Sequence, residues 1–410
     1  MATSSCRYIK GSNQHMQKSK LGRVAAATLG LALVVASCGS DTKTPAGTTA
    51  GTAGASTSDT TGAAGGVKCD GITIGYLGAL SGDNGALGQN MVNGAQIALD
   101  DFNTANPGCQ VKFDKQDSQG DPAQATPLAT TLANDASIIA LIGPGFSGES
   151  KATMPTFETA GLPVISPSAT NAKLTTNGWK MFHRILANDD KQAPGVVQLI
   201  TGTIKATKVG VIDDASDYGK GLADSVRTGL AALDIANSTI DPKAADYSAA
   251  VTAMKDAGVD TVFYAGYYAE AAKLLTQLRD AGVKATFVSG DGSLDPAFVT
   301  GAGAAADGAY LTATGAPPDV NADFAAKFNT KFGTVPGLYS PESYDCAQVI
   351  LAGIAAGKVT RADMAAFIDA YDAPGITKPI KFDATGEPAG SAVFYTIVEG
   401  GKLVSKGLIP

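Results

Sequence analysis

From residue 71 onward, short runs rich in β-branched residues alternate with segments that have helical periodicity. In the first unit, the run from Ile72 to Leu77 leads into a Gly-rich turn over 78–85. Apolar residues then recur at spacings of three and four, which places them on one face of a helix; they are Met91, Ala95, Ala98, Leu99 and Phe102. This alternation is typical of the α/β class, in which helices cover both faces of a parallel sheet.

The alternation runs twice along the chain. Further β-rich runs lie at 138–142 and 163–165, and the run at 208–212 begins a second series. That series is expected to contain helices over 219–233, 248–257 and 269–281, and strands over 261–264 and 286–288. A single open sheet rarely exceeds about ten strands, so two halves of roughly 115 residues each predict two sheets and two lobes.

The composition excludes several classes of function. The chain has 31 Lys and Arg residues against 38 Asp and Glu residues, and its net charge of −7 would repel the phosphates of nucleic acid. The two histidines are His15 and His183, and no two of the five cysteines form a C-x-x-C pair, which excludes the common zinc sites. We therefore expect no nucleic-acid partner, no bound metal and no cofactor.

The first 38 residues are typical of an export signal. Basic residues without acidic ones precede an apolar run over 24–36, which is shorter than the ~20 residues that a membrane helix needs. The run ends in Val35-Ala36-Ser37-Cys38, which resembles the bacterial lipobox and implies that Cys38 carries a lipid outside the cytoplasmic membrane. Residues 39–66 are almost wholly small and polar, a composition that stays flexible. We expect a signal peptide over 1–37 and a flexible linker over 38–68; the alternative is an ordinary signal peptide with an incidental cysteine.

An oxidising location outside the cytoplasm permits disulfides. Cys69 and Cys109 each stand just ahead of a β-rich run, at 72–77 and 111–113 respectively. If these runs are neighbouring parallel strands of one sheet, their starting ends lie side by side, so we predict a disulfide between the two cysteines. Cys346 lies in an apolar helical stretch and is expected to pack as a small hydrophobic residue.

Glycines and small polar residues gather in four turns that directly follow predicted strands, at 143–148, 166–170, 265–268 and 289–293. In open parallel sheets, ligands bind beyond the carboxyl ends of the strands. The turns of the first half offer hydroxyls and backbone N–H groups to a carboxylate, whereas the second half offers carboxylates and phenols to an ammonium group. The whole set predicts a site for a zwitterion, although each residue alone would also serve as a helix cap or turn former.

Known enzyme signatures are absent from the sequence. The segment from Gly143 to Ser150 nearly matches a phosphate-binding loop, but Glu149 stands where that loop has lysine, so we reject nucleotide binding. No nucleophile elbow and no dinucleotide-binding glycine motif opens a helix. His183 lies in an alternating run over 179–185 and is expected to face solvent or a neighbouring residue; an enzyme would depend on this one histidine and a nearby serine.

An ordered series of motifs resembles the leucine/isoleucine/valine-binding proteins, which are type I periplasmic binding proteins that deliver ligands to ABC importers. The series spans about residues 70–400 and comprises Ile74 to Gly82, Asp117 with Asp121-Pro122, Ile142-Gly143-Pro144, Ile165 to Thr170, Asp217 to Gly221, Tyr264 to Tyr267 and Phe382 to Glu387. The resemblance implies two Rossmann-like lobes with parallel sheets, joined by a three-stranded hinge near 186–190, 312–316 and 388–392. Lobe 1 is expected over 69–187 and 316–389, and lobe 2 over 188–315 and 390–410.

The resemblance also implies which residues hold a ligand. In lobe 1 they are Phe146, Ser147, Ser168, Ala169 and Thr170, which correspond to the loops that bind an amino acid's carboxylate and ammonium groups. In lobe 2 they are Tyr218, Tyr267 and Asp291. Asp291 is the expected ammonium partner, and it is shorter than the Glu that the family often has there.

The implied function is that of a carrier and not of an enzyme. The two lobes close on an amino acid, branched-chain or similar, and the permease of an ABC importer in the membrane recognises the closed form. We expect the protein to be a monomer. Two alternatives stay open: the ligand is an amide, urea or an aromatic acid, or the protein is the ligand-sensing subunit of a signalling receptor.

Overall fold

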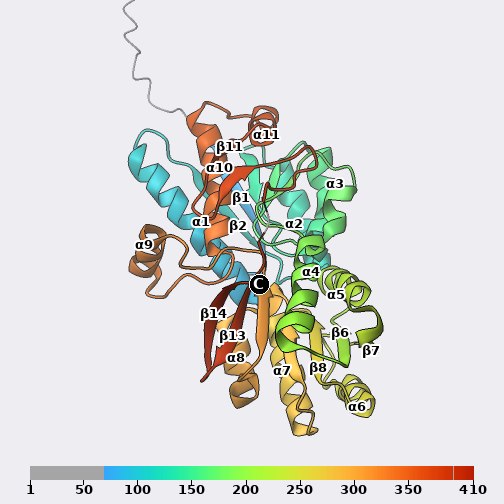
Figure 1. Cartoon of the computed structure of the whole chain (residues 1–410). Helices are drawn as coiled ribbons and strands as arrows, with labels where there is room; N and C mark the ends of the chain where they lie inside the picture. Colours follow the sequence, from blue (N-terminus) through green and yellow to red (C-terminus); the bar gives the residue numbers. More distant parts are fainter. Residues whose placement is uncertain (1–68, 391) are drawn as a thin grey trace, which may run out of the picture. The chain divides into compact units, whose positions relative to one another are not determined.

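In the part of the chain that the structure describes, the strands form two main sheets and one short hairpin (Figure 1). The computed structural model describes residues 69–390 and 392–410. The predicted signal peptide over 1–37, the predicted lipid site at Cys38 and the predicted linker over 38–68 lie outside the described residues.

The first sheet has five parallel strands in the order β2-β1-β3-β4-β5. They are β1 (Thr73–Gly78), β2 (Lys112–Asp117), β3 (Ile138–Ile142), β4 (Val164–Ser166) and β5 (Phe182–Arg184). Every residue of β1 and β3 is buried, as expected of central strands whose two faces are both covered. β2 forms an edge of the sheet, and its polar sequence is partly exposed. The predicted parallel sheet is therefore confirmed for the first half.

The second sheet has seven strands in the order β14-β13-β10-β9-β8-β6-β7. They are β6 (Val209–Asp213), β7 (Asp234–Thr239), β8 (Thr261–Ala265), β9 (Thr286–Ser289), β10 (Tyr310–Ala313), β13 (Phe394–Glu399) and β14 (Lys402–Leu408). The strands from β6 to β10 are parallel, as predicted.

The second sheet departs from the parallel arrangement at one edge, which the sequence analysis did not predict. β13 pairs antiparallel with β10, and β14 pairs antiparallel with β13. The two strands are joined by Gly400 and Gly401, which both have positive φ, at 57° and 73°. Because a two-residue Gly-Gly turn with positive φ matches the twist of a hairpin, the chain turns back here and adds an antiparallel edge.

Eleven α-helices cover the sheets within the described residues. They are α1 (Gly85–Ala105), α2 (Pro122–Asn134), α3 (Ser147–Thr159), α4 (Asp189–Gln198), α5 (Asp217–Leu230), α6 (Ser248–Ala257), α7 (Tyr268–Asp280), α8 (Pro296–Ala302), α9 (Ala322–Phe332), α10 (Ser340–Ala355) and α11 (Arg361–Asp369). Polar side chains cap several of them: Asp121, Asn188 and Ser216 accept hydrogen bonds from backbone N–H groups in the first turns of α2, α4 and α5. The cap at Ser216 explains why α5 begins two residues before the predicted start at 219.

The chain passes between the two sheets at three places. It leaves the first sheet after β5, returns after β10, and leaves again after the hairpin of β11 (Asp372–Pro374) and β12 (Pro379–Lys381). On its return, α10 packs side by side with α1 of the first lobe (Figure 1). The approach is close enough to require a glycine in α1, because a Cβ on Gly94 would lie 2.0 Å from the carbonyl oxygen of Ser340.

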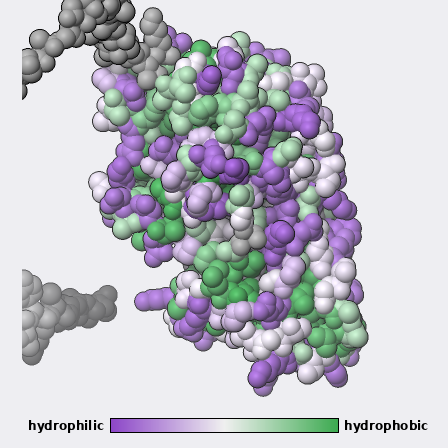
Figure 2. All heavy atoms as spheres, turned by 45° about the horizontal axis from the view of Figure 1, so that its top comes forward, coloured by the Kyte–Doolittle hydropathy of each residue, from purple (hydrophilic) through white to green (hydrophobic). Residues whose placement is uncertain are grey.

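The surface in view is largely hydrophilic, with hydrophobic residues gathered in smaller patches (Figure 2). In the part of the chain that the structure describes, no helix combines the length and the apolar character that crossing a bilayer requires.

The predicted disulfide between Cys69 and Cys109 is confirmed. The two cysteines precede β1 and β2, which are neighbours in the sheet, and their Cα atoms lie 5.0 Å apart. Cys346 is the free cysteine of the described residues and is fully buried in α10, which agrees with the prediction that it packs as a hydrophobic residue.

Removal of this disulfide is expected to lower the free energy of unfolding. The bond closes a loop over a sequence separation of 40, and loops of this order restrict the unfolded chain by about 2–4 kcal/mol. Urea unfolding of a Cys69→Ala/Cys109→Ala double variant measures the loss. As a control, reductant should lower the stability of the unaltered protein to the same level and leave the double variant unchanged; equal stability of all four samples would contradict the prediction.

Candidate functional site

Eight residues line a small cavity between the carboxyl ends of the strands of the two sheets. They are Phe146, Ser147, Ser168, Tyr218, Tyr267, Asp291, Gly292 and Tyr339. The residues from the first sheet follow β3 and β4, those from the second sheet follow β6, β8 and β9, and Tyr339 directly precedes α10. This is the edge of an α/β sheet at which ligands bind.

Six of the eight predicted site residues line this cavity, and two do not. Ala169 and Thr170 are buried next to Ser168 in the same loop but are not part of the cavity wall. Gly292 and Tyr339 line the wall and were not predicted. Gly292 directly follows Asp291, whereas Tyr339 lies far along the chain at the start of a helix and follows no strand.

Glu149 fixes the loop that carries Phe146 and Ser147. Its side chain, in the first turn of α3, is fully buried. The carboxyl accepts hydrogen bonds from the backbone N–H of Phe146, at 2.7 Å, and from the hydroxyl of Ser118. Burial raises the pKa of Glu149 to about 7. The residue that replaces the lysine of a phosphate loop thus points inward and organises the backbone.

Arg184 fixes the second loop of the first lobe. Its side chain has no exposed surface, and Nη1 donates hydrogen bonds to the carbonyl oxygens of Ala169 and Asn171, at 2.8 and 2.9 Å. The guanidinium also pairs with Glu387 at 2.5 Å. The hydroxyl oxygen of Ser147 accepts a hydrogen bond from the backbone N–H of Asn171 at 3.1 Å, which joins the two loops. Arg184 was not predicted, because it acts on the site through backbone carbonyls and does not line the cavity.

Asp291 is the acidic group of the cavity wall. It is 1% exposed; Oδ1 accepts a hydrogen bond from the phenol of Tyr218 at 2.7 Å, and Oδ2 accepts one from the phenol of Tyr339 at 2.5 Å. Burial raises the pKa of Asp291, while the hydrogen bonds from the two phenols act in the opposite direction. Since an ionised carboxylate accepts about four hydrogen bonds, each oxygen can take a further donor.

Aromatic rings from both lobes meet at the cavity. The ring centroids of Phe146 and Tyr267 lie 4.6 Å apart across the cavity, and those of Tyr218 and Tyr267 lie 5.3 Å apart. The remaining cavity measures about 10 Å³, which is room for about one water molecule. A ligand of amino-acid size therefore requires that the lobes part or that the rings turn aside.

Polar contacts join the two lobes close to the cavity. Nζ of Lys151 in α3 lies 2.7 Å from the carboxylate of Asp217 in α5, and Nδ2 of Asn171 donates a hydrogen bond to the carbonyl oxygen of the same aspartate. The backbone N–H of Ala86 in α1 donates a hydrogen bond to the phenol oxygen of Tyr268 in α7 at 3.3 Å. The two lobes are thus in the closed arrangement.

The histidine that an enzyme would need lies away from this cavity. His183 is buried in β5, and its Nε2 lies 2.9 Å from the carboxylate of Asp369, so it faces a neighbouring residue as predicted. Within residues 69–390 and 392–410, no group of three or more His, Cys, Asp or Glu side chains is placed to hold a metal ion. The hydroxyls, phenols and single carboxylate of the cavity suit the binding of a small polar molecule.

Comparison with known proteins shows similarity along nearly the whole described chain. The model of the periplasmic binding protein family matches residues 71–402. The chain is 29% identical over 343 residues to the Leu/Ile/Val-binding protein BraC3 of Rhizobium johnstonii, an alignment that covers 82% of this chain and 93% of that protein. It is 33% identical over 255 residues to the leucine-specific-binding protein of Salmonella typhimurium, which covers 60% of this chain and 68% of that protein.

The fold is also similar to that of a solved structure. This is the branched-chain amino acid transporter substrate binding protein LivJ from Streptococcus pneumoniae, in complex with isoleucine. The TM-score is 0.76 at 28% sequence identity, and the match covers 83% of this chain and 99% of that chain. Both lobes therefore take part in the similarity.

The buried carboxyl of Glu149 is expected to make stability depend on pH. Its pKa is about 7 in the folded protein against 4.5 for the free group, so its contribution to stability is fully present below pH 4.5 and is lost as the pH rises through 7. A shift of this size corresponds to about 3 kcal/mol between the two limits. In Glu149→Gln the amide oxygen still accepts the hydrogen bond from Phe146, but this part of the pH dependence disappears.

Urea unfolding at pH 5 and pH 8 measures the difference. Asp214 and Glu342 also have pKa values near 7, so the unaltered protein and Glu149→Gln both keep a residual slope. The exposed residue Asp256 provides the control, and Asp256→Asn should behave like the unaltered protein. If Glu149→Gln shows the full pH dependence, Glu149 does not titrate in this range.

Proposed function

Since the chain belongs to the periplasmic binding protein family, we propose that it captures an amino acid, branched-chain or similar, between its two lobes and delivers it to the permease of an ABC importer. Asp291 is the observation that carries this proposal. A buried carboxylate at the strand ends, opposite hydroxyls and backbone N–H groups of the other lobe, matches the two charged groups of a zwitterion. The relatives named for leucine, isoleucine and valine support the same ligand class.

The first lobe would bind the carboxylate of the ligand. Ser147 and Ser168 line the cavity from this lobe. Ser147 is the first residue of α3, where the backbone N–H groups of a helix start favour negative charge. The hydroxyl of Ser168 donates a hydrogen bond to the carbonyl oxygen of Gly145 and would have to turn to reach a ligand. Thr170 is fully buried in the same loop, and its hydroxyl oxygen has no hydrogen-bond partner among the described residues. Ala169 and Thr170 do not line the cavity, so they would contribute to binding by fixing the shape of this loop.

The second lobe would bind the ammonium group. Asp291 supplies the negative charge, and the rings of Tyr218 and Tyr267 offer aromatic faces for cation–π contact. Phe146 and Tyr267 form the apolar part of the wall, against which an aliphatic side chain would pack. The phenols of Tyr218 and Tyr339 hold the carboxylate in one orientation, so the ammonium would meet a preorganised partner.

Closure of the two lobes would require no covalent step. Lobe 1 would comprise 69–187 and 316–389, lobe 2 would comprise 188–315 and 390–410, and the hinge would lie near 186–190, 312–316 and 388–392. A ligand that contacts both lobes stabilises the closed form by its difference in affinity for the closed and open forms. The closed form would then be the one that a permease recognises, and the protein would act as a monomeric carrier without catalysis.

The protein would be held at the outer side of the membrane by a lipid on Cys38. The basic start, the apolar run and the sequence Val35-Ala36-Ser37-Cys38 support an export signal of the lipoprotein type. Cys38→Ser is expected to move the protein from the membrane fraction of its host to the soluble extracytoplasmic fraction. Retention of the variant in the membrane fraction would contradict the lipid anchor while leaving the binding function open to its own test.

Aliphatic amino acids are expected to raise the stability of the purified protein. A ligand that binds only the folded state adds RT ln(1 + [L]/Kd), or about 2.7 kcal/mol at one hundred times Kd. Thermal unfolding, after unfolding and refolding to remove carried-over ligand, should show this shift with leucine, isoleucine or valine within a panel of the twenty amino acids, amides, urea and aromatic acids. A shift with amides, urea or aromatic acids alone would overturn the amino acid as ligand.

Asp291→Asn is expected to weaken binding of the same ligand by at least about 30-fold, since the loss of a buried charged partner costs about 2 kcal/mol or more. Titration calorimetry measures the change. Asp256→Asn, on the exposed face of α6, is the matched control and should bind as the unaltered protein does. Unchanged affinity of Asp291→Asn would show that the ammonium lies elsewhere.

A further inference from the structure

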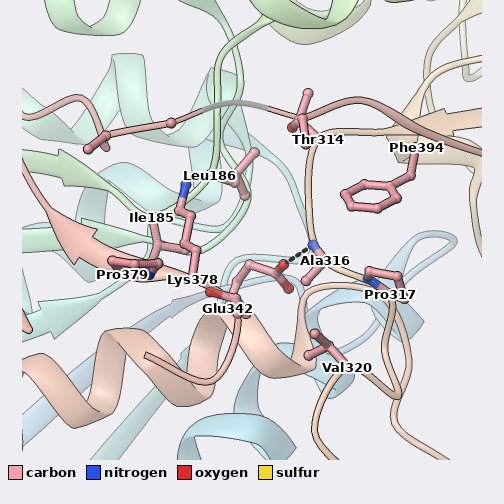
Figure 3. Close-up of a pocket in the computed structure, with 14 residues that line it drawn as sticks. Ile185, Leu186, Thr314, Ala316, Pro317, Val320, Glu342, Lys378, Pro379 and Phe394 are labelled. Carbon is pink, nitrogen blue, oxygen red and sulfur yellow. Dashed lines mark hydrogen bonds between the residues drawn. The ribbon is translucent and has the colours of Figure 1, made fainter. Parts of the chain in front are cut away.

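A second and larger cavity lies where the chain passes between the lobes (Figure 3). Each passage contributes to its wall: Ile185 and Leu186 from the first, Ala316 from the second, and Phe394 at the end of the third. We call this space the hinge pocket. Its volume of about 410 Å³ is within the range of small-molecule sites, about 300–1,000 Å³. None of the eight residues around the interlobe cavity lines the hinge pocket, so the two spaces are separate.

Glu342 lines the hinge pocket and has one carboxylate oxygen that is buried and unpaired among the described residues. The residue lies in the first turn of α10 and is 2% exposed. Its Oε1 accepts a hydrogen bond from the backbone N–H of Ala316 at 2.6 Å, whereas Oε2 has no hydrogen-bond partner among the described residues. The second passage packs directly on this carboxyl, because a Cβ on Gly315 would lie 2.9 Å from Oε1.

Lys378 brings the opposite charge to the same pocket. It lies just before β12, and Figure 3 shows its side chain at the wall with no hydrogen bond to Glu342. Burial lowers the pKa of Lys378 and raises the pKa of Glu342 to about 7. Each charge acts favourably on the other, but in both groups the cost of burial is larger than this attraction. A molecule that brings a positive group to Glu342 and a negative group to Lys378 would stabilise both.

We propose that the hinge pocket binds an α-amino acid with an apolar side chain, its ammonium on Glu342, its carboxylate on Lys378 and its side chain against Ile185, Leu186 and Phe394.

Other small-molecule classes fit the charges of the pocket less well. A simple carboxylic acid would satisfy Lys378 but leave Oε2 of Glu342 without a donor. An alkylamine would satisfy Glu342 but leave the ammonium of Lys378 unpaired. An uncharged apolar molecule would remove water from both groups and pair neither, which is costly for buried charges. An α-amino acid carries both charges on one end and leaves its side chain for the apolar wall.

The proposal does not rest on the function proposed for the interlobe cavity, because the residues are different. The test is equilibrium dialysis of the purified protein with radiolabelled L-leucine at concentrations into the millimolar range, where a Kd of about 1 mM corresponds to a weak second site. Two bound molecules per chain are expected for the unaltered protein. Asp291→Asn should weaken the interlobe site at least about 30-fold and leave the Kd of the hinge pocket unchanged, whereas Glu342→Gln should do the reverse.

Two variants test the hinge pocket, and each removes one of its two charges. In Glu342→Gln the amide oxygen still accepts the hydrogen bond from Ala316, and Lys378→Met keeps the length and apolar character of the side chain. In the Asp291→Asn background, each change is expected to weaken the remaining binding of L-leucine at least tenfold. Thermal unfolding without ligand checks that each variant is folded; if Glu342→Gln is not, Lys378→Met alone carries the test.

Two analogues that each lack one charge complete the experiment. In Asp291→Asn, 4-methylpentanoate and 3-methylbutylamine should compete with L-leucine at least tenfold less well than unlabelled L-leucine does. Binding that survives in Asp291→Asn but not in the folded hinge variants supports the proposal even if the interlobe cavity binds no leucine. The proposal is overturned if Asp291→Asn binds no L-leucine, if its binding is unaffected by the hinge variants, or if either analogue competes equally.

Discussion

The ion pair between the buried Arg184 and the partly buried Glu387 ties the loop over 166–171 of the first lobe to two of the three passages between the lobes. Arg184 holds the carbonyl oxygens of Ala169 and Asn171, and the same carboxylate oxygen of Glu387 accepts a hydrogen bond from Nδ2 of Asn188 at 2.9 Å. Removal of Glu387 would cost about 3–5 kcal/mol, because the guanidinium of Arg184 would be left buried and unpaired. The loop over 166–171 and the two passages therefore keep one relative geometry, which the site needs if it is to form in the same way each time the lobes close.

The two lobes contribute different kinds of polar group to the cavity wall. No Lys or Arg side chain lines the cavity within the described residues, so a ligand's carboxylate would depend on hydroxyls and backbone N–H groups. The one acidic group, Asp291, is held by a phenol from each side: Tyr218 lies in the first turn of the second lobe's α5, and Tyr339 directly precedes α10, which packs on the first lobe. Because Tyr339 reaches Asp291 across the gap, the orientation of the carboxylate depends on closure itself.

The site residues that follow strands could be predicted from the sequence, because the end of a parallel strand determines where the next turn lies. Ser147, Ser168 and Asp291 illustrate this, and the disulfide followed from the same strand order. Tyr339 could not be found in this way: it precedes a helix that returns to the first lobe, and its contact with Asp291 joins residues 48 positions apart. The antiparallel edge beyond β10 was missed although Gly400 and Gly401 are a hairpin signal, because the α/β pattern favoured a parallel sheet.

Apart from the hydrogen bond from Tyr339 to Asp291 in the cavity wall, the contacts that hold the lobes together without a ligand are individually weak. Lys151 and Asp217 are 64% and 37% exposed, and exposed pairs of this kind are worth about 0–1 kcal/mol. The contact of the Phe146 and Tyr267 rings adds about 0.5–1.5 kcal/mol, and a ligand that enters between them would replace it. The closed form therefore has little stabilisation of its own that is independent of the cavity. A ligand bound to both lobes needs only a few kcal/mol of differential affinity to control the population of the closed form, which is the property a carrier requires.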